Sequence, residues 1–141
     1  MNSIRNPLRR AMTFSAVIAL AALVAACSSS TSSSGDDGNT GGGTIAVTDG
    51  VVELSAADLA FDASVIQATA GEAFTISFAN NDTAPHNVAI YTEEGGEEIV
   101  KGEVIDGGAT IEIEVPAQEA GEYYFVCDVH PDMNGTLVVE G

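Results

Sequence analysis

Short runs in which apolar and polar residues alternate dominate the chain from about residue 44 onward. Alternation with a period of two puts the apolar side chains on one face of an extended segment, so each run predicts a half-buried β-strand. The clearest cases are Ala73 to Phe78 and Ala109 to Val115. Nothing in this region has the pattern of a long helix.

Turn-forming residues separate these runs at intervals of about 8–12 residues. Asp49-Gly50, between Thr44 to Val47 and Val51 to Leu54, is typical of a tight hairpin. Acidic residues from Glu93 to Glu98 are expected to form a solvated loop. The other predicted strands are Phe61 to Thr69, Val88 to Tyr91, Tyr123 to Cys127 and Leu137 to Val139. Seven to eight short strands predict an all-β fold, an antiparallel β-sandwich.

The N-terminal 26 residues have the pattern of a secretion signal. Three arginines give a basic start, and Thr13 to Ala26 is an apolar run of about 14 residues, shorter than the roughly 20 that a membrane span needs. The run ends in Val24-Ala25-Ala26-Cys27, which resembles a bacterial lipobox. We therefore expect residues 1–26 to be a lipoprotein signal peptide and Cys27 to be lipidated. An ordinary secretory signal with an incidental cysteine is the alternative.

Residues 27–43 begin with Cys27, and the rest of this segment is nearly all Ser, Gly, Thr, Asn and Asp. Such a segment cannot bury enough apolar area to fold, so we expect a flexible tether. The remaining segment, residues 44–141, is long enough for one domain with a single modest core.

The charge of the chain is strongly negative, at −17. Without the predicted signal peptide, Lys101 is the single base against 21 acidic residues, which gives −20. A surface of this sign repels polyanions and excludes nucleic acid as a partner. Steering toward a basic partner and adaptation to high salt both remain open as explanations.

The strong metal ligands of the predicted domain fall into two short segments. The chain has two histidines, His86 and His130, and its only methionine beyond the leader is Met133. Cys127 is its only cysteine besides Cys27. Two imidazoles, one thiolate and one thioether are the ligand set that blue copper electron-transfer sites use. This composition indicates a copper protein.

The spacing of these ligands favours loops. Cys127 to Met133 spans seven residues, and Pro131 within it and Asn134-Gly135 after it disfavour a helix. A tight loop between two strands is therefore expected. His86 would come from a distant loop that the preceding Pro85 stiffens.

Two stretches of the chain resemble a known family. Ala70 to Val88 and Ala120 to Gly135 make it similar to cupredoxins of the plastocyanin and amicyanin group. The short Cys-x-x-His-x-x-Met loop is amicyanin-like, and the acidity is similar to that of halocyanins. The resemblance covers about 80 residues, from Phe61 onward.

The resemblance implies a Greek-key sandwich that holds one copper ion cycling between Cu(I) and Cu(II). His86, Cys127 and His130 would be the near-planar strong ligands, and Met133 the long axial one. His86 would be buried, whereas His130 would lie near the surface and pass electrons.

The resemblance also implies residues that surround the ligands, Pro85 among them. The Asn87 N–H would donate to the Cys127 thiolate, and the Asn87 side chain would tie the two loops together. Val129 stands where amicyanin has proline, so we hypothesise a second hydrogen bond to the sulfur. Asp128 and Asp132 are departures, and their charges are expected to favour Cu(II) and lower the potential.

We therefore predict a blue copper protein that carries single electrons and is not an enzyme. It would be a monomer outside the cytoplasm, lipid-anchored to the cell membrane on its periplasmic or cell-surface side. Its partner would be a redox protein with a basic surface, such as a cytochrome c or a membrane oxidoreductase. A copper storage or delivery module is the alternative, although such modules favour His-rich or Met-rich tracts. A sandwich with a vestigial site is a third possibility.

Overall fold

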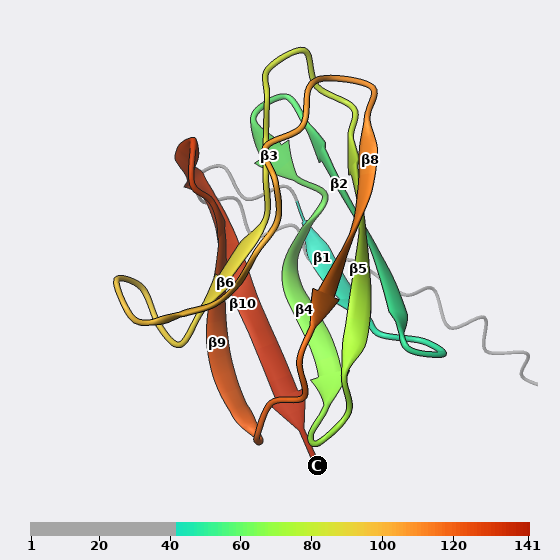
Figure 1. The fold of residues 1–141 in the computed structure, drawn as a ribbon, viewed down its shortest axis with the longest axis vertical. Helices are drawn as coiled ribbons and strands as arrows, with labels where there is room; N and C mark the ends of the chain where they lie inside the picture. Colours follow the sequence, from blue (N-terminus) through green and yellow to red (C-terminus); the bar gives the residue numbers. More distant parts are fainter. Residues whose placement is uncertain (1–41) are drawn as a thin grey trace, which may run out of the picture. The chain divides into compact units, whose positions relative to one another are not determined.

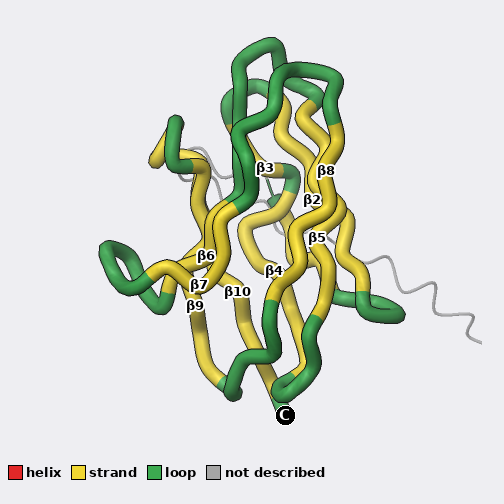
Figure 2. Tube along the Cα trace, viewed as in Figure 1, coloured by secondary structure: helices red, strands yellow, loops and turns green. Residues whose placement is uncertain are grey.

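The computed structural model describes residues 42–141, which form ten β-strands and no helix (Figures 1 and 2). The strands are β1 (Gly43–Ala46), β2 (Val51–Ala57), β3 (Ala60–Phe61), β4 (Ala63–Thr69), β5 (Phe74–Asn80), β6 (Ala89–Tyr91), β7 (Glu98–Lys101), β8 (Thr110–Val115), β9 (Gly121–Cys127) and β10 (His130–Glu140). They build a six-stranded sheet in the order β1-β4-β10-β9-β6-β7 and a four-stranded sheet in the order β3-β2-β5-β8. The predicted all-β sandwich is confirmed, with ten strands rather than seven or eight.

The pairing of the strands is mixed, with more antiparallel than parallel pairs. Five pairs are antiparallel, but β1 with β4, β4 with β10, and β2 with β5 run parallel. An alternating pattern shows which face of a strand is buried and carries no information on the direction of its neighbours. The parallel pairs arise where the chain crosses between the sheets.

The predicted hairpin at Asp49-Gly50 shows this crossing. Both residues have positive φ angles, 52° and 79°, as the two central positions of a type I′ turn require. Thr48 and Val51 exchange two backbone hydrogen bonds of 2.9 and 3.0 Å. Beyond the turn, β1 pairs with β4 in one sheet and β2 pairs with β5 in the other. The turn exists, but it changes sheets instead of joining paired strands.

The edge strand β7 was not predicted, because the acidic residues before it indicated a loop. It pairs antiparallel with β6 and ends at Lys101. The two-residue strand β3 was also too short to stand out from the turn around it.

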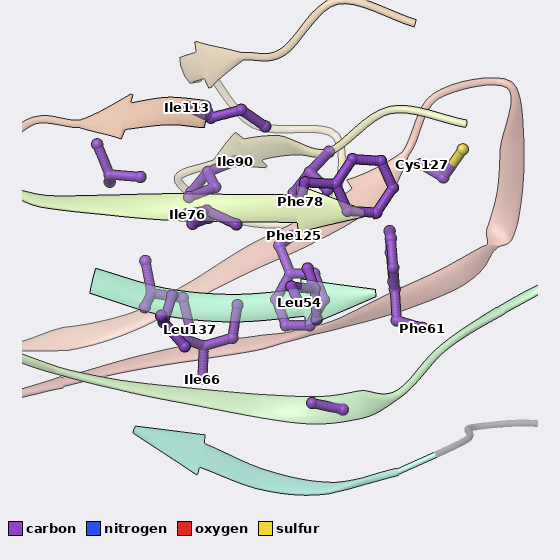
Figure 3. Packing of buried hydrophobic residues seen from close by; sticks show 14 of the residues in the cluster. Leu54, Phe61, Ile66, Ile76, Phe78, Ile90, Ile113, Phe125, Cys127 and Leu137 are labelled. Carbon is purple, nitrogen blue, oxygen red and sulfur yellow. The ribbon is translucent and has the colours of Figure 1, made fainter. Parts of the chain in front are cut away.

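Apolar side chains from both sheets fill the space between them (Figure 3). The largest of these, each at most 1% exposed, are Leu54, Ile66, Ile76, Phe78, Ile90, Phe125 and Leu137. Burying one such side chain contributes about 1.5–3 kcal/mol. Phe61 packs against Phe78 and Phe125 with ring centroids 6.1 and 5.5 Å apart. Figure 3 shows this trio at the end of the core where Cys127 lies.

Several predictions concern residues outside the described range. The signal peptide, Cys27 and the tether up to residue 41 belong to that part of the chain. Within residues 42–141, no helix is long and apolar enough to cross a membrane.

Candidate metal centre

Two connections meet at one end of the sandwich. One follows β5 and carries His86 three residues before β6, and the other joins β9 to β10. β6 and β9 are antiparallel neighbours, with Ala89 opposite Val126. This register brings the segment before Ala89 to the same sheet end as Cys127. The expected convergence of the ligand loops is present.

Three ligand atoms form a compact triangle at this end. Cys127 Sγ lies 3.6 Å from His86 Nδ1 and 4.0 Å from His130 Nδ1, and the two nitrogens are 3.1 Å apart. A point inside this triangle lies about 2.1 Å from all three atoms. Zinc, for comparison, binds imidazole nitrogen at about 2.0–2.1 Å and thiolate sulfur at about 2.3 Å. These three side chains could hold one metal ion.

The loop from Cys127 to Met133 is a bulged hairpin. His130 pairs with Cys127 and Asn134 pairs with Val126, so residues 131–133 stand out of the ladder. Met133 nevertheless turns inward, because only 2% of it is exposed and it belongs to the same apolar cluster as Cys127. The tight loop between two strands is thus as predicted.

Exposure distinguishes the ligand candidates. His86 and Cys127 are fully buried, at 0% exposure, whereas His130 is partly exposed. His130 is therefore the one of the three that can meet another molecule.

Asp82 orients His86, a role that its turn-rich sequence did not reveal. Its carboxylate lies 3.1 Å from His86 Nε2 and accepts backbone hydrogen bonds from Leu59 at 2.8 Å and Thr83 at 2.6 Å. The Leu59 N–H first, and then His86 and Thr83, hold the pKa of Asp82 far below its ordinary value. An ionised carboxylate only accepts, so Nε2 carries the proton and Nδ1 offers its lone pair.

Asn80 fixes the loop that carries His86. Its buried side chain donates to the carbonyls of Ala84 at 2.8 Å and Ile105 at 3.0 Å, and it accepts from the Asp82 N–H at 3.0 Å. The backbones of His86 and Ile105 exchange hydrogen bonds of 3.1 and 2.9 Å. Buried polar groups need such partners, so the bonds of Asn80 explain how an irregular loop can lead into the buried His86. Pro85 is exposed within this loop, and its stiffening role stays a prediction.

Asn87 ties the two ligand loops together, as expected. Its side-chain oxygen accepts from the Asp128 N–H at 2.9 Å, and its nitrogen donates to the Asp128 carboxylate at 2.9 Å and to the Gly102 carbonyl at 3.3 Å. The backbone hydrogen bonds from Asn87 and Val129 to the Cys127 sulfur stay predictions.

Asp128 has two further partners that the sequence did not indicate. Lys101 Nζ lies 2.9 Å from its carboxylate, and the Tyr91 hydroxyl donates to it at 2.8 Å. Burial alone would raise the pKa of Asp128, but hydrogen bonds from Asn87, Lys101 and Tyr91 outweigh burial and lower it. The bond to Asp128 raises the pKa of both Lys101 and Tyr91. Asp132, in the same loop, is exposed.

Comparison with known proteins agrees with this geometry. The family described as cupredoxin-like domain matches residues 16–139. The chain is 32% identical to amicyanin-alpha of Methylorubrum extorquens over 91 residues, which cover 64% of this chain and 73% of the relative. Its fold is similar to that of dithionite-reduced auracyanin from Roseiflexus castenholzii, with a TM-score of 0.58, 20% identity, and coverage of 66% of this chain and 98% of auracyanin. A Cu(I) form of an amicyanin variant gives a TM-score of 0.51 at 30% identity, over 67% of this chain and 86% of that one. The chain belongs to the family of cupredoxin-like domains.

Proposed function

We propose that the protein binds one copper ion through His86, Cys127 and His130 and carries single electrons. The observation that carries this proposal is the triangle of donor atoms, whose centre lies at bonding distance from all three. Support also comes from the similar amicyanin, whose variants have been solved in Cu(I), oxidised and reduced forms.

Met133 would complete the site as a weak axial ligand. It is buried in the ligand loop. A thioether is the weak axial ligand of blue copper sites, whereas zinc sites use Cys, His and carboxylate ligands. Structural zinc sites take four strong ligands. Within residues 42–141, His86, Cys127 and His130 form the only such group of histidine, cysteine and acidic side chains, and it supplies three.

Rigidity is the contribution of the chain to electron transfer. Bound copper supplies a one-electron change between Cu(II) and Cu(I). Asp82 holds the His86 ring, and Asn87 joins the two loops. Because these bonds fix the donor atoms in advance, little has to move when the charge at the site changes.

Electrons would pass through the partly exposed ring of His130. Leu59, Val104 and Val129 are large apolar residues with 45–49% of their surface exposed. The backbone of Leu59 donates to Asp82, and Val129 directly precedes His130. Val104 directly precedes Ile105, which forms an isolated β-bridge with His86. They give this end an apolar rim on a strongly acidic protein. Such a surface suits a redox partner that has basic residues around the site where its own electron enters or leaves. The protein would thus be a monomeric carrier rather than an enzyme.

Voltammetry of the copper-loaded protein tests this function. We expect a reversible one-electron wave and no copper loss over repeated cycles. An irreversible wave, or fast transfer of copper to a chelator, would support storage or delivery instead.

We further propose that the protein works outside the cytoplasm on a lipid anchor at Cys27, which rests on the lipobox-like sequence alone. Cys27→Ala should move the protein from the membrane fraction to the soluble fraction. Retention of this variant in the membrane would exclude the anchor.

A further inference from the structure

The position of Lys101 is unusual in such an acidic protein. It is the only basic residue after Arg10, in a chain with 21 acidic residues. Its amine nevertheless pairs with the one carboxylate that directly follows Cys127, at 2.9 Å from Asp128. Lys101 is the last residue of the edge strand β7, and the loop it meets comes from β9.

Asp128 is held from three separate segments. Tyr91 of β6 donates to one carboxylate oxygen at 2.8 Å, while Lys101 of β7 and Asn87 of the His86 loop contact the other at 2.9 Å each. The Asp128 N–H is bound by the Asn87 side chain as well. The Asp128 side chain is 24% exposed and that of Lys101 45%. Together these contacts anchor the first residue of the loop between Cys127 and His130.

The charge of this anchor matters for a redox site. A carboxylate next to a ligand stabilises the more positive, oxidised state and lowers the reduction potential. A lysine on the same carboxylate acts in the opposite direction. An ion pair as exposed as this one adds little to fold stability, so its effect on the site is the more informative quantity.

We propose that Lys101 and Tyr91 are positioning residues of the metal centre, which hold Asp128 as an immobile and charge-compensated anchor of the ligand loop. Lys101 then largely cancels the lowering of the reduction potential that is expected from Asp128. The lowering that is expected from the exposed Asp132 remains. This inference rests on the proposed function, because it assumes a redox ion between the two loops.

Reduction potentials of variants at Lys101, Asp128 and Asp132 test the compensation. Lys101→Met should lower the reduction potential and Asp128→Asn should raise it, each by about 40 mV. This shift corresponds to about a fivefold change in the equilibrium constant between the two copper states. The double variant should return close to the original value. Lys101→Arg keeps the charge and should restore most of the potential. Asp132→Asn is the matched control, and its upward shift should add to that of Lys101→Met.

Amide hydrogen exchange on the copper-free protein tests the anchoring. Lys101→Met and Tyr91→Phe should speed exchange at Asp128 and His130 several-fold, while Ile76 in the core strand β5 keeps its rate. Asp132→Asn should leave both regions unchanged. Equal exchange in all variants would contradict the anchor.

The outcomes separate this inference from the proposed function. A protein that shows no reversible wave before any substitution loses the proposed function. If that wave is present, but Lys101→Met and Asp128→Asn leave the potential unchanged or shift it in the same direction, the compensation by Lys101 is wrong.

Discussion

The two histidines of the metal centre lie in very different surroundings. His86 is fully buried, its ring is held by Asp82, and its backbone is paired with Ile105. His130 is partly exposed and begins β10 next to the exposed Val129. The comparison indicates a division of labour, in which the His86 loop fixes the geometry and the His130 loop gives access to a partner.

The largest effect should follow when the thiolate that faces both histidine nitrogens is removed. Cys127→Ser replaces the soft thiolate by a hydroxyl, so the copper–thiolate absorption should disappear completely and Cu(II) affinity should fall by several orders of magnitude. Visible absorption and copper titration measure this loss, and circular dichroism checks that the sandwich persists. A retained thiolate band would exclude Cys127 as a ligand.

Removing each imidazole in turn should show that the two histidines differ in their access to solvent. His130→Gly opens a gap at the surface, so added imidazole should enter it and restore most of the copper spectrum. His86→Gly creates a buried gap under a loop that Asn80 and Asp82 hold closed, so the same concentration should restore little. Titration with imidazole measures the difference. Equal rescue of both variants would contradict the assigned exposure.

Asp82 tests how much the orientation of the buried His86 ring contributes to copper affinity. Asp82→Asn keeps the shape but weakens the bond that orients the His86 ring, and such changes typically cost about 10–100-fold in metal affinity. Copper affinity should fall in that range. Asp62 is a fitting control, because its carboxylate binds Ser55 and not a ligand. Asp62→Asn should leave the affinity unchanged, and an equal loss in both variants would remove the special role of Asp82.

Asn80 tests whether the His86 loop owes its order to buried hydrogen bonds. Asn80→Ala removes a partner from Ala84, Ile105 and Asp82, and a buried polar group without its partner costs about 1–3 kcal/mol. Chemical unfolding of the copper-free protein should show a loss of at least this size. Asn134→Ala removes exposed bonds to the carbonyls of Pro131 and Asp132 and should cost much less.

The smallest effect concerns alkaline pH. Binding to Asp128 raises the pKa of Tyr91 above 10.0 and that of Lys101 above 10.5. Groups with a raised folded pKa stabilise the fold fully below their unfolded pKa and lose this contribution as pH rises through the folded pKa. The melting temperature of the copper-free protein should therefore fall above pH 10, and less steeply in Tyr91→Phe. An identical slope in both proteins would contradict the contact.

The four ligand candidates, the sandwich and the ligand loop could be predicted because each leaves a local signal. Alternation marks β5 and β8, and rare residue types mark His86, Cys127, His130 and Met133. The parallel pairs left no such signal, because alternation is the same whichever way the neighbour runs.

Asn80, Asp82 and Tyr91 were missed for a related reason. Asparagine and aspartate are common in turns, and only the folded loop shows that these two are bonded around His86. Tyr91 has an ordinary strand position. Lys101 was conspicuous as the single base, but its partner Asp128 lies 27 positions away in the chain, and only the strand order brings the two together.

X-ray absorption at the copper edge of the loaded protein tests the central claim most directly. The account predicts two nitrogen neighbours and one sulfur neighbour about 2.1 Å from a single copper ion, which is the distance that the triangle of donor atoms gives. A copper shell of nitrogen and oxygen alone, without a short sulfur distance, would contradict it.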